Sequence, residues 1–174
     1  LEFHAPITID ASGLSTFYSS KKRWRIKDPE LKKFAIWTYY KGAKRDPELD
    51  EGATTIAYVD EKGWFWNIPM QNDMVSTGIV ASREYLYRDG NDPEKIFQRE
   101  IENNAWIKDH LSCGKPCDIY RVTSDYSYRS KYCAEDGILL IGDAYAFLDP
   151  VFSSGVFLAL QSGELAADAV DKAI

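Results

Sequence analysis

The chain has 174 residues, of which 45% are hydrophobic and 28% charged, and these values are typical of about one globular domain. Its formal net charge is −6, from 21 Lys and Arg against 27 Asp and Glu, which argues against a general nucleic-acid or anionic-membrane surface. No apolar run approaches the length of a transmembrane helix and no signal peptide is visible, so we expect a cytoplasmic protein without a membrane span.

Three cysteines, Cys113, Cys117 and Cys133, make an odd number, and three residues separate the first two rather than the two residues of a redox or zinc pair. This pattern fits a reducing compartment. A metal cluster would need a fourth ligand, and the two histidines of the chain are His4 and His110. We therefore predict no metal site, while a Cys/His cluster around His110 stays the minor alternative.

The first predicted element is a strand over residues 7–9, which ends in an acidic, glycine-containing turn from Asp10 to Gly13. Residues 14–33 are polar and strongly basic, with the densest charge at residues 21–25. A charge run of this kind is usually a solvated face, and the alternative is a contact for a phosphate group or a carrier protein.

Four segments rich in aromatic and β-branched residues predict the strands of an antiparallel sheet. A short polar loop with a glycine joins the second segment to the third, as in a β-hairpin. We expect one face of this sheet to be free to cover a pocket. The segments are residues 34–40, 54–59, 64–69 and 74–80.

An Asp-Pro-Glu sequence at residues 92–94 predicts the start of a helix, because it supplies an N-cap side chain, a proline at the first helical position and an acid in the first turn. Apolar residues follow at helical spacing as far as Ala105, so this helix is expected to pack on the sheet. Residues 118–122 and 126–129 then predict strands that lead back toward the C-terminal part.

The stretch from residue 136 to 174 has an order that suits a flat, polyanionic cofactor. An apolar strand over residues 138–141, expected to be buried on both faces, ends at Gly142 and Asp143, where an acid can accept hydrogen bonds from sugar-like hydroxyls. A turn of small residues follows, and a helix then begins near Gly155 with free backbone N–H groups and a positive dipole end that favour an anion or an electron-rich ring edge. The alternative is an ordinary strand, turn and capped helix.

This C-terminal helix is the element that the sequence predicts best. Its apolar and small residues recur at the i, i+3, i+4 and i+7 spacing of one helical face. We expect this face to pack on the sheet. Its members are Val156, Ala159, Leu160, Gly163, Ala166, Ala167 and Val170.

Three motifs resemble the FAD-dependent monooxygenase superfamily, and most closely its flavin-dependent halogenase branch. Residues 142–144, 149–150, 153–155 and the Ala-Leu-x-Ser-Gly sequence at 159–163, in this order, are similar to the second flavin-binding motif of the superfamily. Residues 64–69 match the Trp-x-Trp-x-Ile-Pro signature of the halogenases position for position. Residues 10–13 resemble the Asp-Ala-Ser-Gly segment that precedes the substrate-binding part of these enzymes.

The resemblance implies an α+β fold, in which an antiparallel substrate-domain sheet with helices joins the C-terminal strand-helix half of an FAD/NAD(P)-binding α/β domain. Residues 1–13 and 134–174 would form the partial FAD-binding domain, and residues 14–133 the substrate-binding sheet domain. The G-x-G-x-x-G fingerprint that grips a dinucleotide is absent from the 174 residues. We therefore expect a fragment of a larger halogenase, inactive by itself.

The resemblance also implies FAD, supplied in reduced form by a separate flavin reductase, a halide ion, and a small-molecule or carrier-bound substrate. Tryptophan halogenases carry a glutamate where this chain has Phe152, which favours a phenolic or activated acyl substrate. The family's catalytic lysine lies in the amino-terminal part of the pattern, so no lysine here inherits that role and no catalytic residue is assigned.

The implied site residues form three groups. The cofactor-binding residues are Asp10, Gly13, Gly142, Asp143, Pro150, Ser153, Ser154, Gly155 and Val156. The halide site would consist of Ser153, Ser154 and Gly155. The residues that line the active site would be Trp64, Trp66, Ile68, Pro69 and Phe152; strand alternation places Trp64, Trp66 and Ile68 on one face, which taken alone indicates core packing.

Two other interpretations stay open. The chain could belong to an FAD-dependent monooxygenase or reductase of the same superfamily, although residues 64–69 argue against this. From a different class, it could be a catalytically inert binding fragment. A hydrolase is weakly supported, because the Gly-x-Ser-x-Gly nucleophile elbow is absent.

Overall fold

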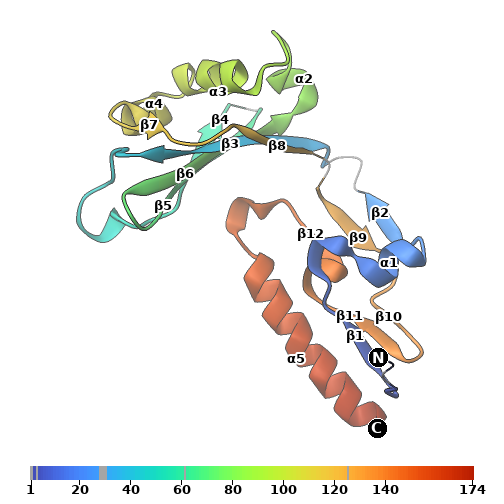
Figure 1. The fold of residues 1–174 in the computed structure, drawn as a ribbon. Coiled ribbons are helices and arrows are strands. Elements are labelled where there is room, and N and C mark those ends of the chain that lie inside the picture. The colour runs from blue at the N-terminus through green and yellow to red at the C-terminus, as the bar shows by residue number, and fades with distance from the viewer. Residues whose placement is uncertain (1, 3, 28–30, 61, 125) are drawn as a thin grey trace. The chain divides into compact units, whose positions relative to one another are not determined.

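The computed structural model describes residues 2, 4–27, 31–60, 62–124 and 126–174, which divide into two compact units (Figure 1). We call Leu1–Leu31 with Tyr126–Ile174 the terminal unit, and Lys32–Asp125 the sheet unit. The terminal unit is larger than the partial FAD-binding domain of the sequence prediction, because it also takes in residues 14–31 and 126–133. Which unit serves the cofactor and which the substrate stays a prediction.

The terminal unit contains two three-stranded sheets. Its strands are β1 (Thr8–Asp10), β2 (Arg25–Lys27), β9 (Tyr128–Ser130), β10 (Ala134–Glu135), β11 (Ile138–Leu140) and β12 (Ala146–Phe147). In the first sheet β11 lies between β1, which is parallel to it, and β10, which is antiparallel. In the second sheet β9 is antiparallel to both β12 and β2. The pairing of β2 with β9 is the reason that the unit reaches residue 31.

The other elements of the terminal unit are short, except for one long helix. They are η1 (Gly13–Ser15), α1 (Phe17–Lys21), η3 (Gly142–Ala144), η4 (Pro150–Phe152) and α5 (Gly155–Ala173). The predicted strands at residues 7–9 and 138–141 and the predicted C-terminal helix are confirmed. The prediction that residues 138–141 are buried on both faces is wrong, since only Leu140 is buried. The reason is an open groove between β11 and the end of α5.

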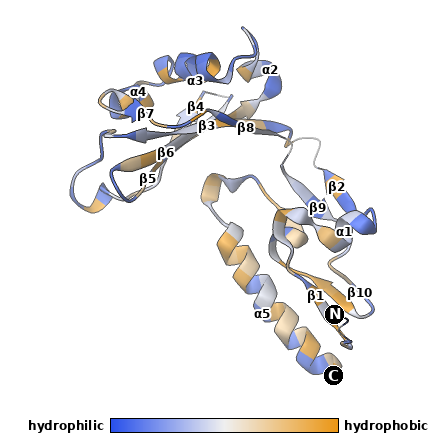
Figure 2. Ribbon diagram, viewed as in Figure 1, coloured by the Kyte–Doolittle hydropathy of each residue, from blue (hydrophilic) through white to orange (hydrophobic). Residues whose placement is uncertain are grey.

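The packing of α5 departs from the prediction. Of the predicted face only Ala166 is buried, whereas Val156 is 73% and Leu160 71% exposed. Figure 2 shows hydrophobic residues along most of the helix. The helix is held mainly through η3, so spacing correctly indicated a helix but overstated how much of its face is covered.

The sheet unit is built on one six-stranded sheet with antiparallel pairing. Its strands are β3 (Lys33–Lys41), β4 (Thr55–Val59), β5 (Gly63–Pro69), β6 (Met74–Ser82), β7 (Lys115–Pro116) and β8 (Arg121–Ser124). The order is β4-β5-β6-β3-β7, and β8 pairs with β3 beside β7. The four predicted strands and their antiparallel arrangement are confirmed, and the strand predicted at 118–122 forms slightly later in the chain.

Helices cover one face of this sheet (Figure 1). They are α2 (Arg83–Leu86), α3 (Pro93–Glu102) and α4 (Ala105–Leu111), with a short η2 (Glu48–Asp50) in the loop before β4. As predicted, the Asp92 side chain caps α3, since its Oδ1 accepts the N–H of Glu94 at 3.0 Å. The core between helices and sheet includes Ile36, Phe65, Val75, Ile79, Phe97 and Ile107. The α+β fold class is confirmed.

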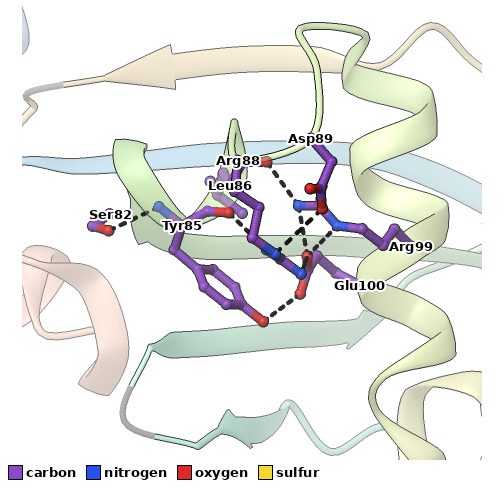
Figure 3. A network of polar contacts seen from close by, with 7 residues as sticks. All are labelled: Ser82, Tyr85, Leu86, Arg88, Asp89, Arg99 and Glu100. Carbon is purple, nitrogen blue, oxygen red and sulfur yellow. Dashed lines mark hydrogen bonds and ion pairs between the residues drawn. The ribbon is translucent and has the colours of Figure 1, made fainter.

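A buried carboxylate ties α2 to α3 (Figure 3). Glu100 is 1% exposed, and its Oε2 accepts a hydrogen bond from Tyr85 Oη at 2.7 Å. Its Oε1 lies 2.8 Å from Arg88 Nη2 and 2.7 Å from Arg99 Nη2. Burial and the hydrogen bond to Glu100 raise the pKa of Tyr85 above its ordinary value. The charge of Glu100 is thus compensated at both oxygens, as a buried ion requires.

Candidate functional site

The turn after β11 is fastened directly to the first half of α5. Gly142 has φ +53°, and a Cβ at this position would stand 3.2 Å from Ala159 Cβ, so a glycine permits this close approach. The Gly142 N–H donates to Ser162 Oγ at 2.9 Å, and Ser162 Oγ in turn donates to the carbonyl of Leu158 at 2.7 Å. The strand end and the helix start therefore form one rigid corner.

A cavity of about 370 Å³ opens at this corner, among the turn before η1, the η3 turn and the first turn of α5. Five of the nine predicted cofactor-binding residues line it, namely Gly13, Gly142, Asp143, Gly155 and Val156. Ala11, Ile141, Phe147 and Ala159 complete the lining. Residues that are more than 100 positions apart in the chain thus meet at one concave surface, which is the usual form of a small-molecule site.

The start of α5 offers backbone donors to this cavity. Ser154 occupies the N-cap position but makes no side-chain capping hydrogen bond, and the Leu158 N–H, bonded to Ser154 O at 2.9 Å, closes the first helical turn. Within the part of the chain that the structure describes, the N–H groups of Gly155 and Val156 have no intrahelical acceptor. A Cβ on Gly155 would meet nothing within 4 Å. This open, donor-rich helix end fits an anion or the electron-rich edge of a flavin ring.

Asp10 lies beside the cavity without lining it. Its side chain is 7% exposed and accepts backbone N–H groups from Ser12 at 2.9 Å and Tyr18 at 2.8 Å. Burial raises the pKa of Asp10, but the hydrogen bonds from Ser12 and Tyr18 outweigh burial and hold the pKa below its ordinary value. The structure therefore gives Asp10 a role in shaping the turn that presents Gly13.

The predicted halide residues are only partly brought together at the cavity. Gly155 lines it, whereas Ser153 and Ser154 do not. Ser153 has a left-handed backbone, φ +50°, and its N–H closes η4 on the carbonyl of Pro150 at 2.9 Å. Phe152 is 90% exposed. The halide assignment and the roles of Pro150 and Phe152 stay predictions.

Phe147 and Ser162 are site residues that the sequence analysis did not single out. The Phe147 ring lies 6.0 Å from that of Tyr126 at a right angle and 6.4 Å from that of Tyr128, between centroids. Its position depends on the pairing of β12 with β9, which has no local signal. Ser162 lies within the Ala-Leu-x-Ser-Gly part of the C-terminal motif, and this was the available signal.

The remaining predicted residues lie on β5 in the sheet unit, and three of them, Trp64, Trp66 and Ile68, are on the face of the sheet opposite its helices. The Trp66 ring lies 5.9 Å from that of Trp64 and 6.3 Å from that of Trp37, between centroids. Gly78 is the ladder partner of Trp66, and a Cβ there would stand 2.3 Å from the Trp66 ring, so the indole occupies the space that a side chain at Gly78 would fill. Ile68 shares this face by alternation, whereas Pro69 is paired with the buried Val75 and belongs to the core side.

Two negative findings hold for the described residues only. No helix among them combines the length and the apolar character that a bilayer crossing requires. They contain no group of three or more His, Cys, Asp or Glu side chains placed to hold a metal ion. All three cysteines are free and exposed.

Known proteins share this arrangement. The chain is 34% identical over 176 residues to the 1H-pyrrole-2-carbonyl-(peptidyl-carrier protein) brominase of Pseudoalteromonas luteoviolacea (strain 2ta16), with 99% of this chain and 43% of that protein covered. It is 34% identical to tryptophan 2-halogenase of Chondromyces crocatus, with 95% and 32% covered. The structure of the flavin-dependent brominase Bmp2 superposes with a TM-score of 0.88 at 31% identity, over 98% of this chain and 44% of that one.

The chain thus spans less than half the length of these relatives. Its similarity to them extends over both units, because the family described as tryptophan halogenase matches residues 2–169. The turn at Gly142, the start of α5 at Gly155 and strand β5 with its tryptophans all lie within this match. The chain therefore belongs to the tryptophan halogenase family.

Proposed function

We propose that the chain is part of a flavin-dependent halogenase, which uses reduced FAD, oxygen and a halide ion to halogenate a phenolic or otherwise activated aromatic or acyl substrate. The observation that carries this proposal is the cavity of about 370 Å³, where the open N–H groups of Gly155 and Val156 meet the Gly142 corner. Residues 1–13 and 134–174 would serve FAD, and residues 14–133 the substrate.

Each residue of the cavity has a defined task in this proposal. The N–H groups of Gly155 and Val156 would hold the electron-rich edge of the flavin ring through the helix dipole. The Asp143 carboxylate would accept hydrogen bonds from the ribityl hydroxyls. Ser153 and Ser154 would complete a halide site at the same helix start. The flavin supplies the electron chemistry, and these residues orient it and exclude water.

The names of the relatives indicate a range of substrates. Two relatives are named for a carrier-bound pyrrole substrate: the brominase of Pseudoalteromonas luteoviolacea and a chlorinase of Pseudomonas fluorescens. A third relative is named for tryptophan. Because Phe152 stands where the resemblance places a glutamate in tryptophan halogenases, we favour a phenolic or carrier-bound acyl substrate. A flavin reductase would deliver the reduced cofactor in the cytoplasm, where the three free cysteines fit a reducing environment.

An FAD titration followed by flavin fluorescence, with and without bromide, tests the proposal. We expect saturable binding that responds to bromide. Gly155→Leu should weaken FAD binding by about tenfold or more, because its side chain fills the space that the ligand needs. Gly163→Ala is the matched control, since this glycine of the same helix also has open space but does not line the cavity.

Either of two results would count against the proposed site. A chain that is folded by circular dichroism but binds no FAD would show that this cavity does not form a flavin site by itself. Equal FAD affinity of the Gly155→Leu and Gly163→Ala variants would place the ligand away from the helix start.

A further inference from the structure

A second cavity lies next to the first in the terminal unit, at the end of the β12-β9-β2 sheet. Its volume is about 180 Å³. Ile26, Leu31 and Leu148 give it apolar walls, and Phe147 closes one side. Because Phe147 also lines the cavity of about 370 Å³, the two cavities are neighbours that share this residue.

One buried hydroxyl in this second cavity has no hydrogen-bond partner among the residues that the structure describes. Ser127 lines the cavity and is 3% exposed, and its Oγ makes no hydrogen bond to any residue that the structure describes. Buried polar atoms are nearly always hydrogen-bonded, because an unpaired one forfeits its bonds to water. An oxygen-bearing ligand would satisfy this hydroxyl.

Tyr128 and Arg129 also line the second cavity. The Tyr128 hydroxyl is already engaged, since it donates to the carbonyl of Asp143 at 2.7 Å, whereas the Arg129 side chain is exposed to solvent and its charge disfavours an ammonium ligand. The cavity therefore combines apolar walls, the buried Ser127 hydroxyl and an arginine at its solvent side. This set of groups matches an aromatic alcohol better than an amine or an alkane.

The size of the cavity limits the ligand to one ring. An apolar protein cavity of about 150 Å³ accommodates one benzene molecule. We infer that the cavity of about 180 Å³ binds a single phenol-sized ring, which stacks against Phe147 and hydrogen-bonds Ser127 Oγ through its hydroxyl. The identity of this ring as the substrate of the halogenase rests on the proposed function, whereas the binding itself does not.

Fluorine NMR of 4-fluorophenol titrated with the chain tests this inference. We expect saturable binding with a Kd on the order of 1 mM, as befits so small a ligand. Ser127→Ala should weaken binding about fivefold, which is the contribution of one neutral hydrogen bond. Leu148→Trp should abolish binding, because an indole fills the cavity.

Ser130→Ala is the matched control. Ser130 ends β9, the strand that begins directly after Ser127, and is 1% exposed; its hydroxyl also lacks a partner among the described residues, yet it does not line the cavity. Its substitution should leave phenol affinity unchanged. The 4-fluorobenzylammonium ion, a cation of similar size, should bind more weakly than 4-fluorophenol.

The outcomes separate this inference from the proposed function. Absence of saturable phenol binding, or equal affinity of the Ser127→Ala and Ser130→Ala variants, would overturn the inference. If FAD binds while phenol does not, only the inference fails. If phenol binds in the predicted order of variants while FAD does not, the inference stands and the proposal that this chain forms a flavin site by itself fails.

Discussion

The two units of the chain differ in how far they bury their apolar residues. In the sheet unit Phe65, Phe97 and Ile79 are completely buried. In the terminal unit the first turns of α5 leave Val156 73% and Phe157 63% exposed. The sheet unit has the core that sustains a fold, whereas the terminal unit has the cavities and the open helix end that a binding surface needs. Stability and binding are thus concentrated in different parts of the molecule.

The largest expected effect tests this contrast directly. Phe97→Ala should lower the free energy of unfolding by about 3–5 kcal/mol, because it leaves a cavity in the core of the sheet unit. Leu160→Ala should change it by about 0.5 kcal/mol or less, since that side chain is 71% exposed. Urea denaturation measures both. Similar losses in the two variants would show that α5 is packed as tightly as the sheet core.

A second, somewhat smaller effect concerns the buried carboxylate of the sheet unit. Glu100→Ala should cost about 3 kcal/mol, because it empties a fully buried position and removes the acceptor that Tyr85, Arg88 and Arg99 share. Thermal unfolding monitored by circular dichroism gives the loss. Exposed Glu102, on the same helix, provides the control, and Glu102→Ala should stay near the wild type. Equal loss in both variants would refute a special role for burial.

The smallest expected effect lies in the terminal unit and depends on pH. Hydrogen bonds hold the pKa of Asp10 below its ordinary value of 3.8, so its ionised form stabilises the unit above that pH. This stabilisation should be lost as pH falls through the lowered pKa. Asp10→Asn should therefore flatten the acid limb of stability against pH, measured by hydrogen exchange of the Ser12 and Tyr18 amides. An unchanged acid limb would contradict the prediction.

Local patterns were enough to predict most of the elements. The aromatic strands, the Asp92 cap and the long C-terminal helix each depend on neighbouring residues, and the structure has them where the sequence places them. The partners of these elements were harder to predict. Helical spacing could not reveal that the start of α5 is largely uncovered, because burial depends on residues distant in sequence.

The candidate site shows the same division. Gly142 and Gly155 were predicted from a motif whose order is contiguous in the chain, and both line the cavity. Phe147 was not predicted, because its position follows from the pairing of β12 with β9. Ser127 was not predicted either, because it lies next to the part of β9 that pairs with β2. The role of Asp10 toward the cofactor stays a prediction, and the sequence did not show that its carboxylate accepts two backbone N–H groups.

The hydroxyl of Ser162 makes the affinity of the cavity and the order of the backbone interdependent. It accepts from the Gly142 N–H and donates to the Leu158 carbonyl, so a single group spans the strand end and the helix. By thermodynamic linkage, a molecule that binds the helix start only while the turn after β11 is closed also protects this turn from opening. Conversely, a looser turn lowers the affinity of a ligand that never touches Ser162.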